Sequence, residues 1–252
     1  MDIQPITGVF GARITGLDLG EAPPAPVVGE IAAALKRYKV LVFPDQPNLT
    51  PDKHLALSAR FGSVELPHPT WPDYPGCPGV KVLTMMGEGD AGGWHTDGAT
   101  RDDPAWISLL QAIEIPPYGR DTVFADMEAA FARLSPALQG FLETLTALHS
   151  WGQEKPDAPP VEHPVVRSDP VTGRKWLYVN ETYTRKIVQL NPKESDALLA
   201  FLCQRIHSPH IQLRVSWKPN ALTVWDNDTT QHFIVRDLVG KRVMHRVMVR
   251  PG

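Results

Sequence analysis

The stretch GWHTDG, residues 93–98, decides how this chain is interpreted, because it brings a histidine and a carboxylate close together. In an extended segment successive side chains point to opposite faces, so His95 and Asp97 lie on one side and Trp94 and Thr96 on the other. An imidazole and a carboxylate on one face can bind a single metal ion. Such a pair arises easily by chance in a chain with 9 histidines, so its meaning depends on the residues elsewhere.

A third candidate ligand is His232, which ends the polar stretch WDNDTTQH at residues 225–232. Two histidines and one carboxylate on one side of a metal leave its other positions open, a pattern typical of non-haem Fe(II) oxygenases. A zinc hydrolase that activates a water molecule with the same three residues is the alternative metal enzyme. Asp226 and Asn227 are expected to orient His232 from outside the ligand set.

Composition excludes several other classes of function. The 252 residues are 42% hydrophobic and 21% charged, as in ordinary globular proteins, and the net charge of −3 gives no electrostatic case for binding nucleic acid or anionic membranes. The N-terminal residues lack the features of a signal peptide, and no apolar run is long enough to span a membrane. Cys77 and Cys203 suit a reducing compartment as unpaired thiols, with a disulfide between them as the alternative, so we expect a cytoplasmic protein.

The distribution of turn residues predicts a mainly β chain with flanking helices. The 25 prolines punctuate many short segments, and no linker divides the chain, so we expect one domain over residues 1–252. Expected helices cover 27–37, 50–61, 127–134, 135–149 and 191–206, and expected strands cover short pieces of 6–19, then 38–43, 80–83, 106–115, 122–124, 163–167, 175–179, 211–217, 221–226 and 242–249.

The last expected strand carries two arginines on one face. Arg242 and Arg246 alternate with a largely apolar set of side chains. Inward-facing guanidinium groups need anions, because a buried unpaired charge is costly, and arginine pairs well with planar carboxylates. Two solvated arginines on an edge strand are the alternative. His245, on the opposite face, is expected to be structural.

These motifs, in this order, resemble the taurine dioxygenase-like (TauD/TfdA) family of Fe(II)- and 2-oxoglutarate-dependent dioxygenases. The resemblance rests on His95-x-Asp97, on WDNxxTQH ending at His232, on Arg242 ten residues later and on Met-His-Arg at 244–246. It extends over most of the chain. Further matching segments are HPVVR (163–167), TGRK (172–175), YVNE (178–181), KES (193–195) and KPN (218–220).

Position by position, the resemblance implies a complete set of site residues. Fe(II) would be bound by His95, Asp97 and His232, which are also the catalytic residues; 2-oxoglutarate by Thr122 and Arg242; and the substrate by His68, Trp71 and Arg246.

The resemblance also implies a double-stranded β-helix (jelly roll, cupin-like) core and a reaction. That reaction is oxidation, chiefly hydroxylation, of a small anionic substrate by O2, with conversion of 2-oxoglutarate to succinate and CO2. Ascorbate is the expected reductant in vitro, and relatives of this kind are often dimers or tetramers. Desaturation or cyclisation in a biosynthetic pathway, and a non-catalytic jelly-roll binding protein, remain the alternatives.

Several positions depart from the taurine enzyme. Ala91 stands where that enzyme has asparagine, Gly98 and Thr100 replace bulkier residues, and the loop at 151–162 is shorter. These differences predict a changed substrate pocket, so taurine is not assigned as the substrate. Tyr183 is a further candidate to line the pocket. The remaining histidines, at 54, 149, 207 and 210, are expected in or beside helices as surface or packing residues.

Overall fold

A computed structural model of the chain describes residues 1–65, 71–86, 92–237 and 240–250. Its largest element is a mixed sheet in the order β1-β2-β3-β15-β7-β17-β6-β5, with β4 paired to β17. All neighbours are antiparallel except β2 and β3. The strands of this major sheet are β1 Asp2–Pro5, β2 Ala12–Thr15, β3 Val40–Phe43, β4 Ser63–Val64, β5 Asp73–Tyr74, β6 Cys77–Met85, β7 Ile107–Glu114, β15 Leu222–Asp226 and β17 Arg242–Arg250.

A smaller antiparallel sheet, ordered β14-β8-β16, forms the second layer of the core. Its strands are β14 Gln212–Val215, β8 Thr122–Asp126 and β16 Thr230–Ile234. The chain crosses repeatedly between the two layers, from β7 to β8, from β14 to β15 and from β16 to β17. Side chains of both sheets share one apolar cluster, which includes Leu110, Phe124, Trp217 and Trp225. This arrangement is the jelly-roll core expected from the sequence.

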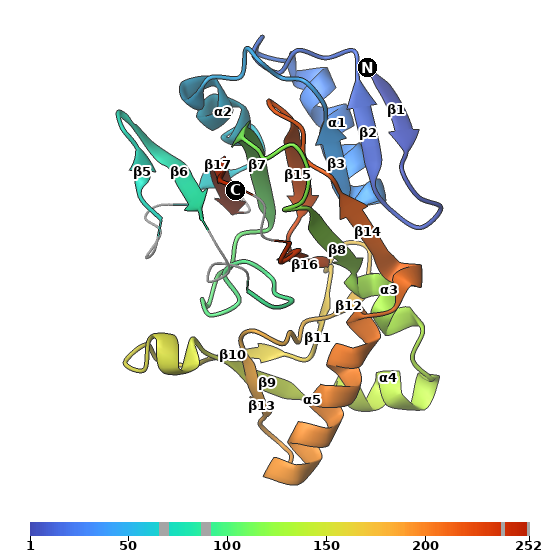
Figure 1. Ribbon diagram of the computed structural model, residues 1–252. Coiled ribbons are helices and arrows are strands. Elements are labelled where there is room, and N and C mark those ends of the chain that lie inside the picture. The colour runs from blue at the N-terminus through green and yellow to red at the C-terminus, as the bar shows by residue number, and fades with distance from the viewer. Residues whose placement is uncertain (66–70, 87–91, 238–239, 251–252) are drawn as a thin grey trace.

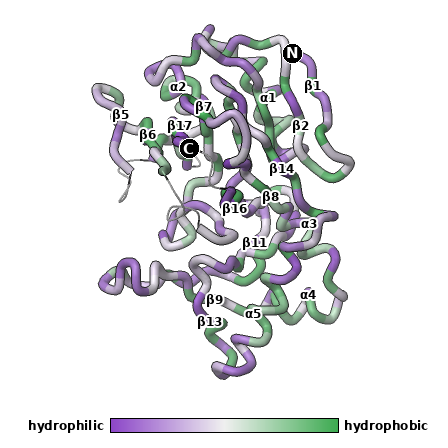
Figure 2. Tube along the Cα trace, viewed as in Figure 1, coloured by the Kyte–Doolittle hydropathy of each residue, from purple (hydrophilic) through white to green (hydrophobic). Residues whose placement is uncertain are grey.

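Helices cover the outer side of the major sheet and build a second apolar core in the lower part of Figure 1. Strand β8 joins the two parts, because Phe124 packs between the sheets while Val123 and Ala125 belong to the second core. Figure 2 shows hydrophobic segments in both parts, around α1 above and between α4 and α5 below. The helices are α1 Ala25–Tyr38, α2 Pro51–Ser58, α3 Met127–Ala132, α4 Pro136–Leu142 and α5 Pro192–Ile206, with 3-10 turns η2 Gly152–Glu154 and η3 Pro209–Ile211.

The remaining short strands lie in the lower part of the molecule. They are β9 Thr146–His149, β10 Val161–Pro164, β11 Val166–Ser168, β12 Lys175–Leu177 and β13 Thr184–Ile187. They form a sheet ordered β10-β9-β13 and a hairpin of β11 with β12. No helix in the described ranges is long and apolar enough to cross a membrane. Both cysteines are free, as predicted.

Local sequence signals explain the helix starts. Asn191 accepts a hydrogen bond from the backbone N–H of Glu194, and the Glu194 carboxylate accepts one from the N–H of Asn191, forming a capping box at the start of the helix expected from residue 191. Thr50 also precedes a helix that begins with proline, but its hydroxyl donates to Asp52 rather than capping the backbone. The same rules therefore predict both starts but only one of the caps.

Several sequence predictions of secondary structure are wrong. The helix expected to reach His149 ends at Leu142, and β9 follows it because its residues pair with β10 and β13. Strand β13 was missed, and so was β16, which carries His232. Polar Thr230 and Gln231 hide β16 in the sequence, yet both are buried, and each side chain hydrogen-bonds a backbone carbonyl.

Candidate active site

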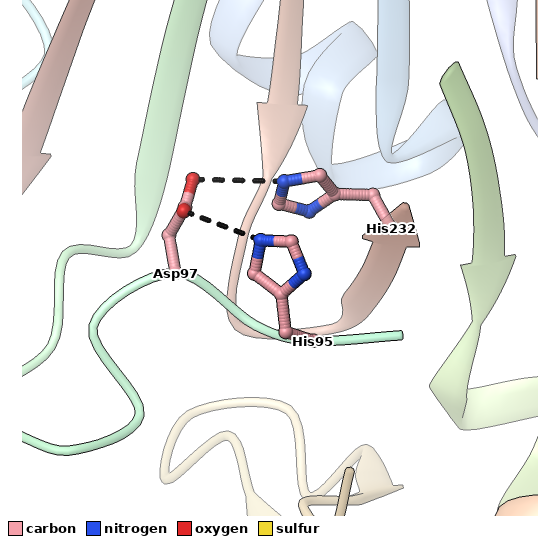
Figure 3. A group of neighbouring side chains, drawn as sticks. All are labelled: His95, Asp97 and His232. Atoms are coloured by element: carbon pink, nitrogen blue, oxygen red, sulfur yellow. Dashed lines mark ion pairs between the residues drawn. The ribbon is translucent and has the colours of Figure 1, made fainter. Parts of the chain in front are cut away.

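The ligand-type atoms of His95, Asp97 and His232 lie within 4.8 Å of one another. Figure 3 shows the Asp97 carboxylate facing both imidazole rings. Backbone hydrogen bonds join the two histidines in both directions, at 3.1 and 2.9 Å, in an isolated β-bridge beside β16. The Asp97 carboxylate oxygens lie 3.7 Å from His95 Nε2 and 3.8 Å from His232 Nε2. These gaps are too long for hydrogen bonds, but they suit donor atoms that each lie about 2 Å from one shared ion.

Both imidazoles are held in the form that a metal requires. His95 Nδ1 lies 2.9 Å from the Gly93 carbonyl oxygen, so Nδ1–H donates and the Nε2 lone pair faces Asp97. Burial lowers the pKa of His232 to about 3, and the nearby His95 adds to this effect. Among the described residues His232 Nδ1 has no hydrogen-bond partner. Neutral imidazole is the ligand form, so the donor set fits a divalent cation.

Asn227 fixes the segment that carries Asp97. Its side-chain oxygen accepts from the Asp97 N–H at 3.1 Å, and its Nδ2 donates to the carbonyls of Asp97 at 2.9 Å and Ala105 at 2.8 Å. The prediction that Asn227 orients His232 is therefore wrong, because the Asn227 amide hydrogen-bonds the backbone of Asp97 and Ala105 instead. Ser108 Oγ also donates to Asp97 Oδ2 at 3.3 Å, a contact that the sequence did not indicate.

Strand β17 lies between β6 and β7 in the major sheet, and its two arginines face the same cavity. Arg242 is 1% exposed and Arg246 is 7% exposed, which excludes the alternative of solvated arginines on an edge strand. Arg246 Nη1 donates to Asp97 Oδ1 at 3.0 Å. On the opposite face His245 packs edge-on against Tyr74, with ring centroids 5.1 Å apart.

Arg242 lies in a pocket of aromatic and polar side chains. Its Nη2 is 3.4 Å from Thr122 Oγ1, its Nη1 is 3.7 Å from Met85 Sδ, and its Cζ lies 5.3 Å from the ring centroid of Trp217. Trp217 Nε1 donates to Thr122 Oγ1 at 3.0 Å. No carboxylate of the described residues forms an ion pair with Arg242. Burial lowers the pKa of Arg242 to about 10, and the charge of Arg120 adds to this effect. A buried guanidinium in this state is suited to a bound anion.

One cavity of about 700 Å³ connects the His95-Asp97-His232 group with both arginines. Trp71 and Tyr183 line it as expected, and burial raises the pKa of Tyr183 to about 12. His68 and Ala91 lie outside the described residues. Sequence reasoning missed several other lining residues, which carry no metal-type spacing or recognisable motif. They include Glu65, Met85, Arg101 and Leu110.

Of the other histidines, His149 differs from expectation and His54 does not. His54 lies in α2 as a fully buried packing residue, and among the described residues neither of its ring nitrogens has a hydrogen-bond partner. His149 lies in β9 rather than at a helix end, and it packs against His163 and Tyr178 with ring centroids 5.2 and 5.7 Å away. Both are interior packing residues.

Comparison with known proteins places this architecture in a family. The profile of the family described as "Taurine catabolism dioxygenase TauD, TfdA family" matches residues 2–248, and the chain belongs to that family. The predictions of the family, the jelly-roll fold and an oxidoreductase of the dioxygenase type are thereby confirmed.

Two relatives and one solved structure illustrate the similarity. The chain is 33% identical to the alpha-ketoglutarate-dependent sulfonate dioxygenase of Saccharomyces cerevisiae, over 94% of this chain and 63% of the yeast protein. It thus spans less than two thirds of that relative. It is 30% identical to the alpha-ketoglutarate-dependent sulfate ester dioxygenase of Pseudomonas putida, over 98% of this chain and 88% of that protein. A crystal structure of a taurine dioxygenase from Burkholderia xenovorans, 33% identical, superposes with a TM-score of 0.90 and covers 100% of this chain and 89% of that one.

Proposed function

We propose that this protein is an Fe(II)- and 2-oxoglutarate-dependent dioxygenase that hydroxylates a small anionic organic substrate and releases succinate and CO2. The observation that carries the proposal is a buried guanidinium, that of Arg242, which lacks a carboxylate partner among the described residues and opens into the same cavity as a His-Asp-His group. A metal site alone suits many reactions. A metal site joined to a buried anion site suits a metal-chelating keto acid.

The residues divide into a metal set and a co-substrate set. His95, Asp97 and His232 would bind Fe(II), while Arg242 and Thr122 would hold the far carboxylate of 2-oxoglutarate. When bound, the iron supplies open coordination positions for the keto acid and O2 and thereby the oxidising chemistry. The protein itself contributes geometry and exclusion of water.

Each part of the chain has a defined task in that geometry. Asn227 holds the backbone of Asp97, and Gly93 fixes the tautomer of His95, so both contacts help to position the donor atoms. Trp217 holds the Thr122 hydroxyl by donating to it. Trp225 packs against His232, with ring centroids 5.1 Å apart, and keeps water from that side of the site.

An anionic substrate is supported by Arg246, which lines the cavity beside Asp97, and by the names of the relatives. Sulfonates and sulfate esters both carry a sulfur oxyanion that a guanidinium binds well. Trp71 would contact the same molecule, and His68, which lies outside the described residues, keeps the substrate role that the resemblance implies. The cytoplasmic location, the homo-oligomer, the single domain, and the use of O2 and ascorbate stay predictions.

The direct test is succinate formation by purified protein with Fe(II), 2-oxoglutarate, ascorbate and O2, over a panel of small sulfonates, sulfate esters, carboxylates and amino acids. We expect succinate to rise with at least one anion, and the organic product to contain one added oxygen atom. Full activity without iron and 2-oxoglutarate would support the zinc hydrolase. Co-substrate binding without any turnover would support the binding protein.

A second measurement separates binding from turnover. Fe(II) and 2-oxoglutarate added together under anaerobic conditions should produce a weak visible charge-transfer band, because the keto acid chelates the metal. Either component alone should not produce the band. Its absence with both components present would contradict the proposed function directly.

A further inference from the structure

We propose that Arg101 is a second substrate-binding arginine of this enzyme and that Glu65 is the positioning residue that holds it. The inference rests on the proposed function and extends it to residues outside the recognised motifs. Arg101 lines the cavity that contains Asp97 and Arg246, and its side chain is 34% exposed. It is therefore a cation at the open side of the cavity, within reach of an entering anion.

The pairing of Arg101 fixes its position while leaving donors free. Its Nη1 lies 2.7 Å from Glu65 Oε1, and the side chain of Glu65 is only 4% exposed. One such contact uses one of the five N–H donors of a guanidinium. Glu65 is anchored in turn, because its backbone N–H donates to the carbonyl of Met248 at 2.8 Å, on the strand that carries Arg246. A buried carboxylate thus holds an arginine at the wall of the cavity.

The backbone beneath Arg101 is also held in place. Gly98 has φ +73°, and the N–H of Arg101 donates to the Gly98 carbonyl at 2.9 Å, which closes a tight turn directly after Asp97. A preorganised side chain loses little conformational freedom when it binds a ligand, so it can contribute to affinity.

The position of Arg246 explains why a second cation is needed. One of its terminal nitrogens donates to Asp97 at 3.0 Å, so part of its charge is used by a candidate metal ligand. Arg101 and Arg246 lie on different elements that face one cavity. A sulfonate, sulfate ester or carboxylate held between them would receive hydrogen bonds from two directions. Affinity for the anion, and discrimination against an uncharged analogue, would then depend on Arg101.

The test compares anions with uncharged analogues of the same shape. Anaerobic wild-type protein, saturated with Fe(II) and 2-oxoglutarate, is titrated by calorimetry with butanesulfonate, butyl sulfate and butyrate, and with butanesulfonamide, butanol and butyramide. We expect at least one anion to bind more tightly than its neutral analogue. Arg101→Ala should weaken binding of that anion by about 10- to 100-fold, the range for hydrogen bonds to charged groups, and change binding of the neutral analogue less than about 2-fold.

Glu65 is tested through its dependence on Arg101. Glu65→Gln should weaken anion binding several-fold in the wild-type background and have no further effect in the Arg101→Ala background, because it acts only by positioning the guanidinium. Arg101→Lys, which keeps the charge but not the planar donor geometry, should be intermediate. Arg133→Ala is the matched control, because Arg133 Nη1 donates to the His210 carbonyl at 3.4 Å and does not line the cavity.

Each outcome decides the question. Equal losses for the anion and its neutral analogue would make Arg101 a structural residue and overturn the inference, as would unchanged anion binding in Arg101→Ala or a wild-type protein that prefers no anion. These results would leave the visible band of the Fe(II)–2-oxoglutarate complex intact and the proposed function standing. Absence of that band in the wild type would overturn the proposed function and this inference with it.

Discussion

At one end of the cavity Arg242 and Thr122 are 1% and 2% exposed, whereas at the other end the side chain of Arg101 is 34% exposed and Glu154 lies at the surface. The first end is built from β8 and β17, inside the two-layered core. The second is built from a turn after Asp97 and from the segments around Trp151 and Tyr183. A buried end with fixed side chains suits a co-substrate that is the same in every reaction cycle. An end built from loops can change its side chains without disturbing the core.

This difference also explains which residues the motifs revealed. A buried guanidinium has few acceptable surroundings, so Arg242, Thr122 and the ligand set occur in a fixed order that a resemblance detects. Loop positions tolerate many residue types, so Arg101 and Glu65 match no motif. The comparison predicts that substitutions at the buried end affect every substrate equally, while those at the open end affect substrates selectively.

The largest loss of activity is expected from Asp97→Ala, which should impair binding of both the co-substrate and the substrate. The substitution removes a candidate ligand and the partner of Arg246. Loss of an outer-shell partner alone typically costs about 10- to 100-fold in metal affinity or activity, so loss of the ligand should reduce succinate formation by more than about 100-fold. Retained turnover, with a retained anaerobic visible band, would show that Asp97 is not a ligand.

Arg242→Ala should affect the buried end alone. Removing one member of a buried charge pair costs about 2–5 kcal/mol, so the Kd for 2-oxoglutarate should rise by about 100-fold. Binding of the anionic substrate at saturating co-substrate should change little. Anaerobic titration of the visible band measures the first quantity, and Arg101→Ala, which should leave the Kd for 2-oxoglutarate unchanged, is the control. Equal affinity for 2-oxoglutarate in Arg242→Ala and Arg101→Ala would contradict the assignment of the buried end of the cavity to the co-substrate.

Trp217→Phe should produce a smaller effect at the same end. The ring over Arg242 is kept, but the hydrogen bond to Thr122 is lost, and such a bond contributes about 0.5–1.5 kcal/mol. We expect the Kd for 2-oxoglutarate to rise about 3- to 10-fold in the same titration. Trp106→Phe is the matched control, because Trp106 does not line the cavity and its Nε1 has no partner within the described residues. A similar change in both variants would contradict the role of the hydrogen bond.

The remaining effect concerns stability rather than ligand binding in the cavity. Burial lowers the pKa of His54 to about 3 from its ordinary value of 6.5, and the nearby His245 adds to this effect, so the folded chain keeps His54 neutral. The unfolded chain binds a proton there below pH 6.5, and the free energy of unfolding therefore falls by about 1.4 kcal/mol per pH unit from pH 6.5 toward 3. His54→Phe removes this contribution.

Urea unfolding at pH 7.5 and pH 5.0 tests the prediction. The loss of stability between the two values should be about 2 kcal/mol smaller in His54→Phe than in the wild type. Co-substrate affinity at pH 7.5 should be unchanged, because His54 does not line the cavity. An unaltered pH dependence would show that His54 has the same pKa in the folded and the unfolded chain.

Much of the fold followed from local patterns. The capping box at Asn191 and the alternation along 242–249 predicted α5 and β17 correctly, because each signal depends on neighbouring residues. Strands β9, β13 and β16 could not be predicted from local patterns. Their residues become strands only because they pair with segments far away, and the buried hydrogen bonds of Thr230 and Gln231 cannot be read from a polar stretch.

The candidate site divides in the same way. His95, Asp97, His232 and Arg242 could be picked out from their residue types and order, because metal and anion chemistry permits few substitutes. The contacts around them appear only in the folded chain: Asn227 holds Asp97, Trp217 holds the hydroxyl beside Arg242, and a turn and a distant strand bring Arg101 to Glu65. Spacing along a chain constrains local geometry, whereas contacts between distant segments depend on how the two sheets and their loops pack.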